Sequence, residues 1–273
     1  MTDYVIYTGM AKREKDPQNK ALLQTIANDE LTHANVWKKY TRRDVKPKRL
    51  KVLWYTLMSR VMGYTFVLKL MEKGEYTTGN DYQQLLAEIP EAEKIIHDEQ
   101  AHEESLNEML DEERLQYVGA MVLGLNDALV ELTGTIAGFT FAMASTRLVA
   151  LSGIITGVSA TLSMAASNYL AERADGNPNA LKSSLYTGVA YLVTVVCLVL
   201  PYLLFPPHMY VAALATMLAV VLFIIFFFNY YISVAKSLPF GRRFAEMAGI
   251  SLSVALISFV IGLLVKRFLG IDI

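Results

Sequence analysis

The feature that most constrains this chain is a stretch from Ser183 to Ala235 that contains no Lys, Arg, Asp or Glu. Chains that fold in water rarely run so long without charge, whereas helices embedded in lipid must avoid it. Most of the charged residues of the chain lie before Tyr117. This contrast predicts two domains, one in water over residues 1–116 and one in a membrane over residues 117–273.

The membrane part contains five apolar segments, each long enough to cross the hydrocarbon core at roughly 20 residues per span. The predicted spans are Val118–Ala144, Leu148–Leu170, Leu185–Phe205, Met209–Val234 and Met247–Val265.

The orientation of the spans follows from the positive charges that flank them. With the N-terminus inside the cell, the inner flanks hold Arg114, Arg173, Lys182, Lys236, Arg242 and Arg243, and the outer flanks hold Arg147, Lys266 and Arg267. The first residues lack the apolar stretch after a basic start that marks a cleavable signal. We therefore expect an integral protein of the cell membrane, with a cytoplasmic N-terminal domain and the C-terminus outside.

The first 116 residues are predicted to be all-helical, which makes the whole chain all-α. Apolar residues recur at helical spacing between Asn19 and Tyr40 and again between about Arg49 and Glu75. A third helix begins near Pro90 and meets no Gly or Pro before Gly119, so it is expected to run unbroken toward the membrane. The residues before Pro17 supply a short first helix, which completes a four-helix bundle.

Two Glu-x-x-His motifs, Glu30–His33 and Glu99–His102, indicate a metal site in this bundle. Residues three apart share a helix face, so one carboxylate and one imidazole can hold the same ion. A ferritin-like di-metal centre needs two such helices and an acid from each of the other two. The best candidates for those acids are Glu72 and Asp3. Mixed carboxylate and imidazole ligation favours iron, as a di-iron centre, or manganese.

Acidic residues also occur inside the first predicted span, where a charge is costly unless it lines a polar pathway or has a partner. Asp127 and Glu131 lie four residues apart and share a face, with Asp127 near mid-membrane. On the second span Met164, Asn168 and Glu172 recur at the same interval. A thioether, an amide and carboxylates together would form a translocation path for a borderline divalent cation.

Three further observations limit the function. The net charge of −1 argues against nucleic acid as a partner. The single cysteine, Cys197, excludes a disulfide scaffold or a Cys-type zinc site. The first span carries the small pairs Ala120/Gly124 and Gly134/Gly138, a spacing that permits close helix packing and predicts contact between two first spans in a homodimer.

The segments GLNDALVELTG and LSMAASNYLAE resemble the vacuolar iron transporter family from about Tyr117 to the C-terminus. The resemblance implies five spans, a homodimer, and movement of Fe(II) or Mn(II) away from the cytosol in exchange for protons. The family's first-span Asp matches Asp127, and its second-span Ser-Met matches Ser163 and Met164. This chain departs from the family at Asn168, where Glu is usual, and the connection over Ala171–Ser184 is too short for the metal-binding insert of plant members.

The N-terminal 116 residues resemble rubrerythrin-type ferritin-like domains, and the combination resembles membrane-bound ferritin proteins that export iron. The matching positions are Glu30, His33, Glu72, Glu99 and His102, whereas Asp3 stands where Glu is usual. The resemblance therefore implies an iron exporter with a cytosolic di-metal bundle.

Two other functions remain open from the residues alone. One is a membrane-anchored di-iron oxidase or peroxidase of rubrerythrin type. The other is a metal sensor that signals into the membrane without transport. An anchor needs only one span and has no use for Asp127 and Glu131 within it, so the sequence favours transport.

Overall fold

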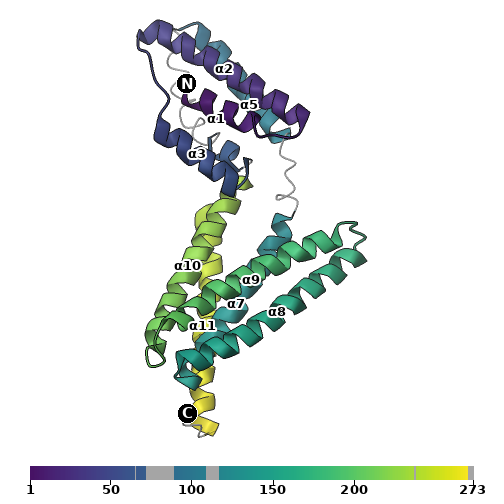
Figure 1. The fold of residues 1–273 in the computed structure, drawn as a ribbon, viewed down its shortest axis with the longest axis vertical. Helices are drawn as coiled ribbons and strands as arrows, with labels where there is room; N and C mark the ends of the chain where they lie inside the picture. Colours follow the sequence, from purple (N-terminus) through teal and green to yellow (C-terminus); the bar gives the residue numbers. More distant parts are fainter. Residues whose placement is uncertain (65, 72–88, 109–116, 237, 270–273) are drawn as a thin grey trace. The chain divides into compact units, whose positions relative to one another are not determined.

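The computed structural model describes residues 1–64, 66–71, 89–108, 117–236 and 238–269. Within these ranges the chain is helical and has no strand, which confirms the predicted all-α class (Figure 1). The chain divides into two compact units, Met1–Arg114 with Val234–Ser237, and Leu115–Ser233 with Leu238–Ile273.

The first unit is built from α1 (Thr2–Ala11), α2 (Pro17–Thr41), α3 (Arg49–Val61) and α5 (Glu91–Glu108). The start of α2 is fixed by the Asp16 carboxylate, which accepts hydrogen bonds of 2.9 Å from the backbone N–H groups of Gln18 and Asn19. Helix α2 packs against both α1 and α5. The buried side chains between α1 and α2 are Ile6, Tyr7, Met10, Leu23 and Ile26.

The predicted second helix, Arg49–Glu75, is not continuous. Helix α3 ends at Val61, and Gly63 adopts a φ of 93°, a left-handed conformation that interrupts helical hydrogen bonding and suits glycine. Helical structure resumes over residues 66–71. The remainder of that predicted helix and the following turn lie outside the described residues. So do residues 109–116, over which the third helix was expected to continue toward the membrane.

The second unit contains five helices that are long and apolar enough to span a membrane: α7 (Val118–Met143), α8 (Thr146–Ala174), α9 (Ala180–Leu204), α10 (Tyr210–Ala235) and α11 (Phe240–Leu269). The five predicted spans are therefore confirmed as helices. Several extend beyond the predicted bounds, most of all α11, because an apolar window marks the hydrocarbon core and not the polar turns at its ends.

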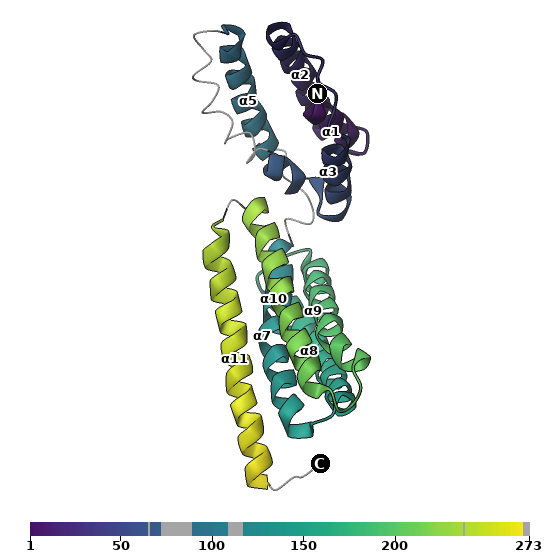
Figure 2. The same cartoon turned by 90° about the vertical axis from the view of Figure 1, so that its left-hand side faces the viewer.

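Helix α7 packs against α8, α9 and α11 and so occupies the centre of this unit (Figure 2). Its buried residues join those of α9 and α10 in one apolar core that includes Leu129, Leu132, Ile136, Leu198 and Met217.

The small residues of α7 are used for contacts within the chain. A Cβ at Gly124 would lie 2.4 Å from the carbonyl oxygen of Thr187 on α9, and one at Gly138 would lie 3.1 Å from that of Ser258 on α11. The small-residue spacing was predicted to join two first spans in a dimer. In the structure it lets α9 and α11 approach the backbone of α7 closely, which is the other use of such spacing.

Gly262 offers a direct test of this packing, because a Cβ there would lie 2.5 Å from the carbonyl oxygen of Gly138. We expect Gly262→Ala to destabilise the purified protein by about 1–3 kcal/mol, the usual cost of overpacking, and to lower its thermal midpoint in detergent. Gly249→Ala is the matched control on the same helix, since nothing lies within 4 Å of a Cβ there. Equal midpoints for the two variants would contradict the close α7–α11 contact.

The connections of this unit alternate between its two ends. Thr146, at the start of α8, donates from its backbone N–H to Pro207 and from its hydroxyl to Phe205, each at 3.1 Å. The α7–α8 and α9–α10 connections therefore meet at one end of the unit. With five helices, the start of α7 and the end of α11 lie at opposite ends of the unit (Figure 2).

Candidate functional site

The two Glu-x-x-His motifs lie on α2 and α5, which run antiparallel and bring the motifs face to face. Oxygen and nitrogen atoms of Glu30, His33 and Glu99 all lie within 4.8 Å of one another, a spacing that fits one metal ion. The rings of His33 and His102 have centroids 6.1 Å apart. The register of the two helices is also held further along, where Glu91 accepts hydrogen bonds from Lys39 and Tyr40.

Each histidine is oriented by an aspartate on the opposite helix. Nε2 of His33 lies 3.1 Å from Asp98 Oδ2, and Nε2 of His102 lies 3.0 Å from Asp29 Oδ2. Sequence reasoning missed both aspartates. The signal was present, because each immediately precedes the Glu of a motif and makes it Asp-Glu-x-x-His.

The other ring nitrogens are available to a metal. Nδ1 of His33 and Nδ1 of His102 are both buried and have no hydrogen-bond partner. Carboxylate oxygens of Glu99 lie within ion-pair distance, at 3.2 Å from His33 Nδ1 and 3.8 Å from His102 Nδ1. Neither contact meets the geometry of a hydrogen bond, and a buried polar atom without a hydrogen bond is costly. A histidine that ligates a metal through one nitrogen while a carboxylate holds the other is the usual arrangement in metalloproteins. The residues therefore fit a metal centre.

The electrostatics of this cluster favour positive charge at its centre. Burial, followed by the negative charges of Glu99 and Asp3, raises the pKa of Glu30 to about 7. Burial would lower the pKa of His102, but its contacts with Glu99 and Asp29 outweigh burial and raise the pKa to about 9. Burial would likewise raise the pKa of Glu99, yet the two histidines lower it to about 2. Without a metal, imidazolium groups supply the cation that the carboxylates attract.

The other two predicted ligands of the bundle are Asp3 and Glu72. Asp3, in the first turn of α1, lies 3.4 Å from Lys51 Nζ and is near enough to Glu30 to raise its pKa, but it is not in the group that could share one ion. Glu72 lies outside the described residues. His97 is exposed on α5 and His208 is exposed between α9 and α10.

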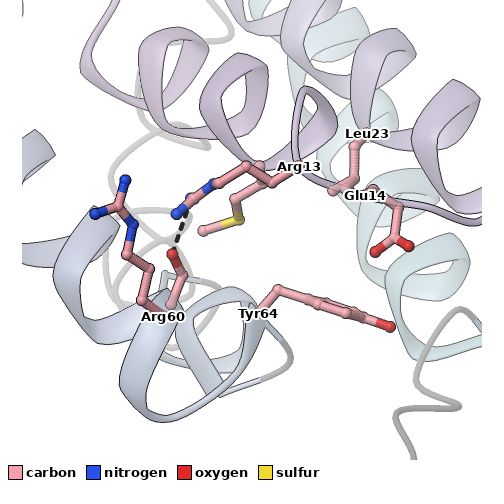
Figure 3. Close-up of a pocket in the computed structure, with 7 residues that line it drawn as sticks. Arg13, Glu14, Leu23, Arg60 and Tyr64 are labelled. Carbon is pink, nitrogen blue, oxygen red and sulfur yellow. Dashed lines mark hydrogen bonds between the residues drawn. The ribbon is translucent and has the colours of Figure 1, made fainter.

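A separate cavity of about 220 Å³ opens between α1, α2 and α3 (Figure 3). Arg13 crosses it and donates a hydrogen bond of 2.9 Å to the Ser59 hydroxyl, and Arg60 lines the same space. Burial, and then the charge of Arg60, lower the pKa of Arg13. The lining contains one carboxylate, Glu14, and no histidine, so this cavity lacks the donor set of a metal centre.

In the membrane unit, Asp127 and Glu131 share one face of α7, and no basic side chain pairs with either within the described residues. Glu131 accepts a hydrogen bond of 3.0 Å from the hydroxyl of Tyr191 on α9. Asp127 is half-buried, and Glu131 is exposed at the surface of the single chain. Tyr191 was not found from the sequence, because a tyrosine in an apolar span has no distinguishing pattern.

The three predicted path residues on α8 differ in their surroundings. Met164 packs against the apolar core of the unit. Asn168 is buried and donates hydrogen bonds to the hydroxyls of Ser183, at 3.1 Å, and Thr187, at 2.9 Å. Glu172 accepts from Ser183 at 2.8 Å and from Asn177 at 2.6 Å. Asn168 and Glu172 thus belong to a polar network that joins the end of α8 to the start of α9.

These features define an integral membrane protein with five membrane-spanning helices. Residues 118–177, which cover α7 and α8, match the model of the VIT family, and this match supports a membrane domain of the vacuolar iron transporter type. Neither the curated proteins nor the solved structures contain a match to the chain. The matched segment includes every predicted path residue, from Asp127 to Glu172.

Proposed function

We propose that this protein is a transporter that exports divalent iron, or manganese, from the cytosol in exchange for protons. The observation that carries the proposal is the pair Asp127 and Glu131, two carboxylates in an apolar helix without a basic partner in the described part of the chain. Carboxylates are rarely retained at such positions unless they serve an ion pathway or a proton relay. The match of α7 and α8 to the VIT family also supports transport of a metal ion across the membrane.

The proposed residues of the translocation path would have different roles, set by the chemistry of their side chains. Asp127 and Glu131 supply the negative charge that a dication requires, and either carboxylate can carry a proton on the return. Met164 adds a soft thioether ligand, which suits Fe(II) better than Mg²⁺ or Ca²⁺. Asn168 and Glu172 place hydrogen-bonded polar groups at the end of α8, where the connection to α9 begins.

The bundle would act as a di-metal centre that captures or senses the ion before transport. Glu30, His33, Glu99 and His102 would hold the metal, and Asp29 and Asp98 would orient the two imidazoles. Asp3 and Glu72 remain the proposed ligands from the other helices. Bound iron would supply redox chemistry there, while the chain's own residues hold the ion and exchange protons with it.

A homodimer is part of the proposal. Glu131 is exposed on the single chain, and a carboxylate that faces hydrocarbon costs at least a few kcal/mol. A second copy against this face of α7 would remove Glu131 from lipid and enclose the path between two sets of ligands.

The second candidate function is a membrane-anchored di-iron oxidase or peroxidase. The observation that favours it is the paired histidine–aspartate arrangement around Glu30 and Glu99, which can hold a redox metal. This candidate gives no role to the acids of α7.

Metal uptake into sealed proteoliposomes separates the two functions. We expect Fe(II) or Mn(II) to enter vesicles that contain the protein, with Zn(II) compared side by side, and we expect the flux to respond to an imposed pH gradient. If no metal moves while the protein consumes peroxide or oxygen, the anchored enzyme is the better description.

The proposed orientation has its own test. With five spans and a cytoplasmic bundle, a tag placed after Ile273 should be labelled from outside intact cells. The reason is that the loops richer in Lys and Arg stay in the cytosol, and these loops lie on the same side as the bundle. External protease should leave the N-terminal bundle whole until the cells are permeabilised. A tag that becomes accessible only after permeabilisation would contradict the proposed topology.

A further inference from the structure

Helix α3 carries a second apolar face that is exposed and has no packing partner among the described residues. Leu50, Leu53, Trp54 and Leu57 are 83%, 66%, 56% and 52% exposed. Their spacing of three, one and three residues places them on a single face of the helix. The other side of α3 faces α1, where Ser59 accepts a hydrogen bond from Arg13 and Lys51 pairs with Asp3. The exposed stripe is therefore additional to the surface with which α3 joins the bundle.

The same segment is strongly basic. Between Thr41 and Val52 lie six basic residues and one acid, Asp44, which pairs with Lys38. All six basic side chains reach solvent, and of these only Lys51 has a carboxylate partner in the described residues. The five others are Arg42, Arg43, Lys46, Lys48 and Arg49. Apolar and cationic groups thus share one short stretch of surface.

We propose that residues 42–57 dock on the anionic headgroups of the bilayer that the protein spans. A helix with Leu and Trp on one face and Lys and Arg around it is the type that lies in the interface plane of a membrane. Clusters of four to eight basic residues near such a helix attract anionic lipid. Here Arg49 and Lys51 lie on α3 and the other four basic residues lie directly before it. In the sequence, nine residues separate the end of α5 at Glu108 from the start of α7 at Val118, so the unit that contains residues 42–57 is joined by a short connection to a helix that can span the membrane.

Charge also argues against a second copy of the chain as the occupant. Two such segments placed face to face would bring their unpaired cations together, and like charges across an interface are costly. An anionic lipid surface covers the apolar stripe and neutralises the cations at once. The inference is independent of the transported ion and needs only that the protein is embedded in a bilayer.

Trp54 provides the measurement, because the chain has only two tryptophans. The full-length protein with Trp37→Phe, which leaves Trp54 as the single reporter, is placed in nanodiscs of phosphatidylcholine alone or mixed with phosphatidylglycerol. Brominated acyl chains quench a side chain that enters the interface. In the anionic discs we expect roughly half or more of the Trp54 emission to be lost, since interfacial helices insert about 5–10 Å. In discs of phosphatidylcholine alone the loss should be small.

Two matched variants sharpen the result. With Trp54→Phe, the remaining Trp37 on α2 should show little quenching in either lipid. Reversing charge in the single-Trp54 protein with Lys46→Glu, Lys48→Glu and Arg49→Glu should abolish the difference between the lipids. Equal quenching in both lipids overturns the role of anionic headgroups. A blue-shifted Trp54 without quenching means that protein covers the stripe, and an unquenched, unshifted Trp54 means that solvent does; either result overturns the proposal.

Discussion

Replacing Asp127 by Asn is expected to reduce divalent-metal flux in proteoliposomes roughly tenfold or more. The substitution keeps the shape and polarity of the side chain but removes its negative charge and the proton it can carry. A tenfold loss requires only about 1.4 kcal/mol, and the attraction between a carboxylate and a dication inside a low-dielectric span exceeds that amount. The flux of Fe(II) and Mn(II) is measured in sealed vesicles, with and without a pH gradient, and the gradient response should disappear together with the flux.

Asp175→Asn is the matched control for this experiment. Asp175 is the residue at the C-terminal end of α8 in the same unit, and it is exposed. Flux should remain at the wild-type rate in this variant, and metal bound by the bundle should be unchanged in both. Should Asp127→Asn transport metal as fast as the wild type, Asp127 has a structural role and the path lies elsewhere.

The second large effect is expected at the bundle. Replacing His33 and His102 together by Ala should weaken Fe(II) or Mn(II) binding to the full-length protein by roughly 100-fold or more, because both nitrogen ligands are lost and ligand number controls affinity. Binding is measured by titration at fixed pH. In the wild type the same titration should release protons, since the pKa of His102 is raised to about 9 and a metal displaces the proton.

His97→Ala is the control for the loss of an imidazole as such, because His97 lies on the same helix as His102 but is exposed. Its metal affinity should equal that of the wild type. Unchanged stoichiometry and affinity in the His33→Ala/His102→Ala protein would remove these histidines from the proposed centre.

The spans were the most predictable part of the fold, because they depend on length and local composition. A long apolar window free of charge leaves few alternatives to a membrane helix, and all five predicted spans are helices in the structure. The predicted helix over Arg49–Glu75 failed for the opposite reason. Glycine is tolerated inside helices, so the sequence does not distinguish a helical glycine from one such as Gly63 with positive φ.

The sequence predicted the parts of the candidate metal site that lie within a single helix. It did not predict the contacts between two helices. The spacing within Glu30–His33 and Glu99–His102 follows from the helical repeat. The pairing of each histidine with an aspartate on the opposite helix depends on the register of α2 against α5. No local sequence pattern predicts that register. For the same reason the sequence did not predict the contact between Tyr191 and Glu131, which are 60 positions apart in the chain.

The glycine contacts of α7 decide which helices can move independently. Gly124 brings the backbone of α9 against α7, and Gly138 and Gly262 bring the backbone of α11 against α7 nearer its C-terminal end, with no side-chain layer between the main chains. Sliding at such contacts would drive a carbonyl oxygen off the glycine and into a neighbouring residue that carries a side chain, whereas contacts between longer side chains can adjust by a change of rotamer. Helices α7, α9 and α11 should therefore move as one rigid block that carries Asp127, Glu131 and Tyr191 together. Helix α8 also packs closely on α9 at Gly157 and Gly188. A cycle that exposes these residues first to one side and then to the other must therefore obtain its motion from α10 or from the movement of whole blocks.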